Sequence, residues 1–306
     1  SHGPDLSDFV QVLTEITSVL KTEQDFYDTA MDYFKSSQER DVKENNWTMA
    51  AVDEANVPNV DHAAKDFDTA MKNWDVEAAD TAVTGLARTA GANQVLEQFA
   101  RYGIRDFRSI GHKAIFVANS WRTLNSIGWQ YAEPVLRSLA YALVNHGSEP
   151  NPAKSDLVPD RAWRRNQGLA DQFRGGWQSG KIDDQATLAL LSTLRSGTSD
   201  EACDQIVELC NQGIHPRASY DAMFLAAGEL LMRQPGIVSL HASTTTNAMH
   251  QTFRNVANDE TRRLIMLQNA AFLPMFRESM NNRGDVGNQR IDEFEPIELD
   301  EDAPLG

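Results

Sequence analysis

The stretch Asp75-Val-Glu-Ala-Ala-Asp-Thr-Ala-Val83 returns later in the chain as Ser199-Asp-Glu-Ala-Cys-Asp-Gln-Ile-Val207. Any single match of this kind is within reach of chance. Several further matches follow in the same order, however, and their common order predicts a tandem duplication of about residues 75–146 and 199–276. These matches are Phe99-Ala-Arg-Tyr-Gly103 with Phe224-Leu-Ala-Ala-Gly228, Ile110-Gly-His112 with Leu240-His241, and Leu139-Ala-Tyr-Ala142 with Leu267-Gln-Asn-Ala270.

Apolar residues recur at three- and four-residue spacing along most of the chain, which is typical of amphipathic helices. The sequence has no Asn-Gly or Asp-Gly hairpin turn and no alternating β-branched run of strand length. We therefore expect an all-α fold. Each repeat would hold four helices, too few to bury their apolar faces alone, so the two repeats should pack together about a pseudo-twofold axis.

The expected organisation is a single compact domain. Residues 147–159 carry three of the eleven prolines and form the clearest loop, between the two repeats. Eight acidic residues against two arginines in the C-terminal segment predict an acidic tail that is either solvated or draped over the surface through Phe294, Ile297 and Leu299. The expected segments are an N-terminal helical region (5–74, with one or two helices within 5–38), helical repeat A (75–146), a loop with connecting helices (147–198), helical repeat B (199–280) and the acidic tail (281–306).

The composition limits the possible partners. The 306 residues include 44 acids and 28 bases, a formal net charge of −16, which argues against nucleic acid because that binding depends on clustered Lys and Arg. No run of residues approaches the roughly 18 apolar residues of a membrane span. Residues 1–4 resemble a cloning remnant, so the compartment stays open between the cytoplasm and export with the leader removed. A small-molecule substrate is the expected partner.

His112 and His241 fall at equivalent points of the two repeats, each near the start of a helix. Because a pseudo-twofold axis brings equivalent helices face to face, the two imidazoles are expected to converge on one metal ion or one ligand. By helical spacing, His112 shares a face with Ile115, Phe116 and Asn119. His250 points to nearly the opposite side of its helix from His241, and His215 precedes Pro216 at a helix start, which favours a capping role.

Further candidate residues surround this pair in the sequence. Glu229 lies in an apolar segment, where a carboxylate is expected to be metal-bound, to transfer protons, or to form a buried ion pair with Arg233. His62 is a fourth candidate metal ligand. Lys113 and Arg122 flank the first histidine helix, where each would either neutralise a substrate anion or lie on a solvated helix face.

Two segments resemble the questin oxidase-like family. Gly111-His-Lys-Ala-Ile-Phe-Val-Ala-Asn-Ser-Trp-Arg-Thr-Leu124, followed by Leu139-Ala-Tyr-Ala-Leu143, is similar to that family's His-x-x-Ile helix with its Arg-x-Leu and Leu-Ala-x-Ala-Leu runs. Leu240-His-Ala-Ser-Thr244 is similar to its Leu-His-x-Val-Thr segment, with Ser243 in place of Val. The resemblance implies an all-helical fold and oxygen chemistry on aromatic polyketides, with histidine-bound iron in some relatives.

Three hypotheses about function stay open from the sequence. The first is a metal-dependent oxidoreductase, with non-haem iron or another divalent metal held by His112 and His241, and with His62 and Glu229 as candidates to complete the ligand set. The second is a non-catalytic module in which the two histidines bind haem or a small molecule. The third is a helical scaffold in which both histidines are buried and structural.

Overall fold

A computed structural model describes residues 35, 49–144 and 150–294, and within these residues every regular element is a helix. The predicted all-α class is confirmed. The helices expected before residue 35 lie outside the described residues. The α-helices are α3 (Ala63–Asn73), α4 (Val76–Thr89), α5 (Ala92–Gly103), α6 (His112–Ile127), α7 (Ala132–Val144), α8 (Val158–Ala170), α9 (Asp184–Ser196), α10 (Ser199–Asn211), α11 (Pro216–Arg233), α12 (Ile237–Asn255) and α13 (Asp259–Met280), and the short 3₁₀ turns are η1 (Arg108–Gly111), η2 (Trp129–Tyr131), η3 (Pro152–Lys154) and η4 (Ile291–Glu293).

Side-chain caps fix where the helices of the two similar segments begin. The Asp75 side chain accepts a hydrogen bond from the Ala78 backbone N–H at the start of α4. At the start of α10, Thr198 and Glu201 form a reciprocal capping box. Each cap satisfies backbone N–H groups that have no partner within the helix, and each contributes roughly 1 kcal/mol to helix stability.

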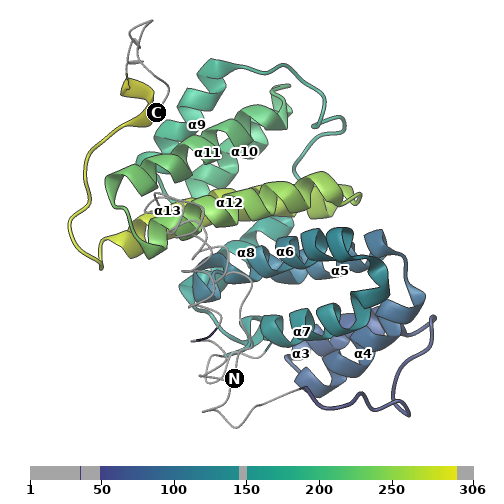
Figure 1. Ribbon diagram of the computed structural model, residues 1–306. Helices are drawn as coiled ribbons and strands as arrows, with labels where there is room; N and C mark the ends of the chain where they lie inside the picture. The colour runs from purple at the N-terminus through teal and green to yellow at the C-terminus, as the bar shows by residue number, and fades with distance from the viewer. Residues whose placement is uncertain (1–34, 36–48, 145–149, 295–306) are drawn as a thin grey trace, which may run out of the picture.

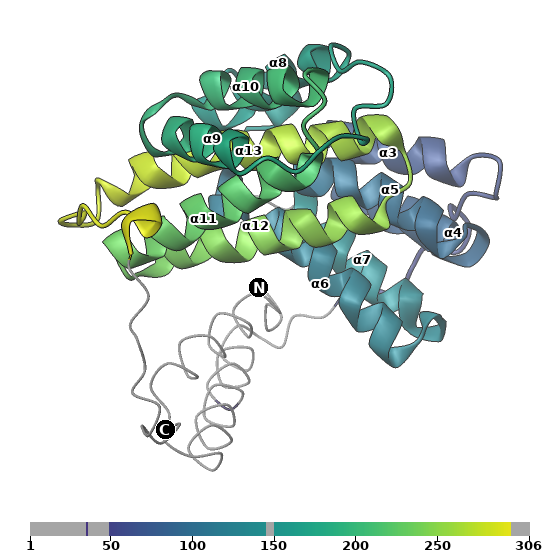
Figure 2. The ribbon, with the colours of Figure 1, turned by 90° about the horizontal axis from the view of Figure 1, so that it is seen from above.

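The helices form two groups that meet along α6 and α12 (Figure 1). In the first group α4 packs on α7, α5 on α6, and α6 on α7; in the second α10 packs on α13, α11 on α12, and α12 on α13. Figure 2 shows α11 and α12 lying side by side, with α6 next to α12. Within the two groups, the helix order and these three pairings correspond between α4–α7 and α10–α13.

Helix α13 forms the centre of the molecule and contacts helices of both groups. Its side chains are buried on nearly every face, including Phe272 and Phe276, which pack edge-on against Phe107. The buried Gln268 satisfies its polar atoms by accepting from Asn166 and donating to the Ile104 carbonyl oxygen. These two bonds tie α8 and the end of α5 to the central helix.

The first part of the acidic segment lies against α11, as in the draped arrangement, but most of its side chains are exposed and Phe294 is not among the contacts that hold it. Arg233 and Gly287 exchange two hydrogen bonds, and the Gln234 side chain donates to three backbone carbonyls between Met280 and Asp285. Backbone groups therefore hold this segment, and charge counts do not reveal such contacts. Residues 295–306 lie outside the described residues.

Of the helices described, none combines the length and the apolar character that crossing a bilayer requires.

Candidate functional site

His112 and His241 meet at the contact between α6 and α12. Their Nε2 atoms are 2.7 Å apart and their rings are nearly perpendicular, with centroids 4.3 Å apart. His241 is buried, and His112 is half-buried with its ring stacked on Phe116. The structure therefore brings together the two histidines that the similar segments place at equivalent positions.

The hydrogen bonds define the tautomers of a neutral pair. Nδ1 of His241 lies 2.6 Å from the carbonyl oxygen of Ile237, which can only accept, so Nδ1 carries the proton. Nε2 of His241 then presents its lone pair, and Nε2–H of His112 donates to it. The first turn of α12 thus orients one imidazole as an acceptor aimed at the other.

A strained turn delivers His112 to this position. Ser109, Ile110 and Gly111 all have left-handed backbone angles, with φ of 54°, 46° and 82°. Positive φ is rare for a β-branched residue such as Ile110, and strain of this kind is concentrated at functional sites. A Cβ at position 111 would collide with the Thr245 side chain on α12, so the glycine allows the two helices to approach closely.

An ion pair closes the loop that contains the strained turn. The carboxylate of Asp106 accepts from Lys113 Nζ at 2.8 and 3.0 Å, and it also accepts from the Arg108 backbone N–H. Both charged side chains are fully buried. Because Lys113 follows His112 directly, this pair fixes how the first turn of α6 is rotated, and hence where His112 points.

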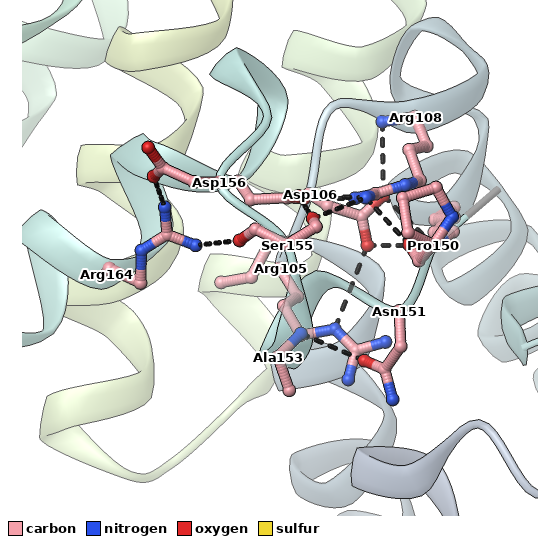
Figure 3. A network of polar contacts seen from close by, with 12 residues as sticks. Arg105, Asp106, Arg108, Pro150, Asn151, Ala153, Ser155, Asp156 and Arg164 are labelled. Atoms are coloured by element: carbon pink, nitrogen blue, oxygen red, sulfur yellow. Dashed lines mark hydrogen bonds and ion pairs between the residues drawn. The ribbon is translucent and has the colours of Figure 1, made fainter.

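A second buried pair anchors the same loop to α8. The guanidinium of Arg108 binds both carboxylate oxygens of Asp160, and it also donates to the Pro150 carbonyl and to the Ser155 hydroxyl. Figure 3 shows Arg105, Asp106 and Arg108 facing the segment from Pro150 to Asp156. The cations of Arg105, Arg108 and Lys113 lie 5.0–5.9 Å from the ring centroid of Trp74.

Burial and charge pairing act in opposite directions on the Asp106–Lys113 pair. Burial alone would raise the pKa of Asp106, but Lys113 and the two neighbouring arginines hold the pKa of that carboxyl below its ordinary value. Burial lowers the pKa of Lys113, while Asp106 opposes that change. Lys113 is thus engaged in an internal pair and does not lie on a solvated face.

The described contacts of Glu229 are those of an ion pair. Its carboxylate accepts from Arg195 at 2.8 and 2.6 Å and from the Ile291 backbone N–H at 3.1 Å, and Arg233 lies 3.8 Å away. No histidine is among these partners. The main cation comes from α9, not from the next turn of α11 as the sequence suggested.

Three further histidines among the described residues lie apart from the pair. His62 is exposed at the start of α3. His250 packs against Tyr220 and Phe224, and burial lowers its pKa. His215 caps α11 by accepting from the Arg217 backbone N–H, which confirms its predicted capping role.

Sequence reasoning missed the residues that position His112. Asp106 and Asp160 were not candidates, because the sequence does not show that Lys113 is fully buried and so needs a carboxylate nearby. The contact between Thr245 and Gly111 follows from the crossing of α6 and α12, which no local pattern encodes.

The histidine pair offers two kinds of chemistry. Two imidazoles that share one proton can transfer it, and two Nε2 atoms aimed at one point can hold a metal ion. In the part of the chain that the structure describes, no cluster of three or more His, Cys, Asp or Glu side chains has the geometry to hold a metal.

Comparison with known proteins gave no relative: no family model, curated protein or solved structure matches this chain.

Proposed function

We propose that this chain is a metal-dependent oxidoreductase that holds a divalent first-row metal, with iron as the leading candidate, between His112 and His241. The observation that carries the proposal is the 2.7 Å contact between the two Nε2 atoms. Equivalent histidines from two helices converge there, at a partly buried point. The reaction class rests on the resemblance of the two histidine segments to the questin oxidase-like family.

The dimensions of the pair suit a small cation. Bonds of about 2.0–2.2 Å to one ion need the two Nε2 atoms roughly 3.0–3.4 Å apart, so they have to separate by less than about 1 Å. His241 already donates its other ring proton to the Ile237 carbonyl, an arrangement that metal-bound histidines commonly have. His112 has to give up or relocate its Nε2 proton, so binding should weaken as pH falls.

Haem suits the pair less well than a small cation. Two axial ligands lie on opposite faces of the macrocycle, so they cannot be in direct hydrogen-bond contact with each other. The contact between His112 and His241 is that close. Non-haem iron oxygenases also hold a small cation with open positions, through two histidines and one carboxylate, and the described residues supply the two histidines.

The test is metal binding by the purified full chain. Elemental analysis and an absorption spectrum should find iron without the intense band of haem, and titration of metal-free protein with Co²⁺ should give one site. His112→Ala and His241→Ala should each remove most of the bound metal and leave the helical circular dichroism unchanged. His250→Ala is the matched control and should bind normally, because its ring partners are Tyr220 and Phe224. Equal metal binding by all three variants would contradict the proposal.

A metal-free proton-transfer pair is the second candidate function, and the direct hydrogen bond between the two Nε2 atoms favours it. In that case metal-free protein should show an imidazole–imidazole hydrogen bond by ¹⁵N NMR, and Co²⁺ should leave those resonances unchanged. Broadening or loss of both imidazole signals on adding one equivalent of Co²⁺ decides for the metal site.

A further inference from the structure

Helix α6 carries a row of side chains that runs from His112 to Arg122. Phe116, Asn119 and Arg122 follow His112 at intervals of four, seven and ten residues, which places them within one broad face of the helix. Phe116 is half-buried, and its ring stacks on His112 with an interplanar angle of 16°. The row therefore begins at the proposed metal site and continues with an apolar shelf.

Arg122 is a half-buried cation that no carboxylate balances among the residues the structure describes. In the described ranges 49–144 and 150–294 no acidic side chain pairs with it, and its one hydrogen bond runs from Nη1 to Oδ1 of Asn119 at 3.1 Å. Burial lowers the pKa of its guanidinium, and no neighbouring charge opposes this change. By contrast, Arg137 and Arg165, which are also half-buried, are paired with Asp80 and Asp204.

Asn119 adds an unused donor at the same place. Its side chain is 7% exposed, and its Nδ2 atom is buried without a hydrogen-bond partner among the residues described. A buried amide N–H that lacks an acceptor costs roughly 1–3 kcal/mol, so the position favours any ligand that brings an acceptor. The amide N–H and the guanidinium lie side by side, because Arg122 donates to the oxygen of the same amide group.

We propose that Arg122 and Asn119 bind the carboxylate of a planar aromatic substrate, which lies along Phe116 with its other end at the histidine pair. The Arg122 guanidinium donates to Asn119. Asn119 follows His112 by seven residues, which is about 10 Å along the helix axis at ~1.5 Å per residue. The other cation beside the first histidine, Lys113, is committed to Asp106 and cannot take this role. The inference rests on the proposed function for what happens at the histidine end, but the anion site itself does not.

The experiment compares two probes of the same shape by calorimetry on the metal-free full chain: 2-naphthoate, which carries a carboxylate, and 2-naphthylmethanol, which is uncharged. The naphthoate should bind at least about tenfold more tightly, because a hydrogen bond to a charged group contributes about one order of magnitude or more. Arg122→Gln should remove that preference and leave the affinity for the alcohol unchanged. Arg254→Gln, at an exposed arginine of α12, is the control and should keep the preference.

Asn119→Asp is the second variant, since it places a carboxylate beside the guanidinium and supports folding with a new ion pair. Naphthoate binding should be abolished although the Arg122 guanidinium is still present, because the introduced carboxylate pairs with that guanidinium and repels the carboxylate of the probe. Equal affinity for the two probes, no naphthoate binding at millimolar concentration, or a preserved preference in Arg122→Gln would each overturn the inference. Because no metal is present, these results do not depend on whether Co²⁺ binds to His112 and His241.

Discussion

Asp106 and Lys113 show how single buried charges position a functional side chain. Both are fully buried, and each is the main counter-charge of the other. Removing one partner of such a pair leaves an uncompensated buried charge and typically costs about 3–5 kcal/mol, whereas removing both costs less. The pair is therefore expected to control both stability and the setting of His112.

The first prediction concerns this pair. Asp106→Asn should lower the free energy of unfolding by about 3–5 kcal/mol, and adding Lys113→Met should restore part of the loss. Because the folded-state pKa of Asp106 is lowered, its stabilising contribution is present above the ordinary carboxyl pKa of 3.8 and is lost as pH falls through the lower folded value. Urea unfolding from pH 7 to pH 3 should thus show a steeper loss below about pH 4 for the wild type than for the double variant. Asp171→Asn, at an exposed carboxylate, is the control, and an equal effect there would refute the assignment.

The site was predictable at the residue scale only where the sequence itself carried the information. The pairing of His112 with His241 follows from the common order of short matches, and it needs no knowledge of side-chain packing. The partner of Glu229 does not follow in this way, because Arg195 comes from α9, outside both similar segments. Sequence proximity favoured Arg233 instead, which lies farther away in the folded chain.

The turn between α5 and α6 is the element that the sequence could least predict. Local preference disfavours three consecutive left-handed residues, one of them Ile110, so tertiary contacts must stabilise the turn. Those contacts are the Asp106–Lys113 and Arg108–Asp160 pairs. The helices on either side, by contrast, follow from apolar periodicity, which is a local property of the chain.

The second prediction tests this turn. Gly111→Ala should destabilise the protein by clearly more than the ~1–2 kcal/mol that left-handed backbone costs an alanine, because its Cβ also meets Thr245. Gly213→Ala is a matched control, since φ is 81° there against 82° at Gly111 and nothing lies within 4 Å of its added Cβ. Thermal unfolding measures both, and ¹⁵N NMR should show the His112–His241 hydrogen bond lost only in Gly111→Ala. Equal destabilisation of the two variants would show that the contact with Thr245 is unimportant.

At the scale of the whole molecule, the arrangement of the helices supports an internal duplication, which we retain as a proposal. Helices α4–α7 and α10–α13 share their order and their pairings within each group, and α6 contacts α12. At this contact His112 meets His241, which would be its equivalent in a duplicated chain. A residue that contacts its equivalent lies on the axis relating two copies, so the candidate site is placed where such an axis would pass.

The acidic segment shows where whole-chain composition misleads. Its charge predicted solvation, but the part up to residue 294 is held by contacts that composition does not record. The Ile291 backbone N–H donates to the buried Glu229, and Asp292 shares Arg195 with that carboxylate at 2.6 Å. The segment therefore completes the environment of a buried ion pair.

The last prediction follows from these contacts. Deleting residues 285–306 exposes the Glu229–Arg195 pair to water and removes Asp292, the Gly287 partner of Arg233 and one of the three backbone partners of Gln234, the Asp285 carbonyl. A few such bonds at roughly 1 kcal/mol each should lower the melting temperature by several degrees in a chain of this size. Deleting only residues 295–306 keeps every described contact, so scanning calorimetry of the two truncations isolates the contribution of residues 285–294. If both truncations melt at the wild-type temperature, docking of this segment contributes nothing to stability, and Arg195 and Arg233 suffice as counter-charges for the buried Glu229.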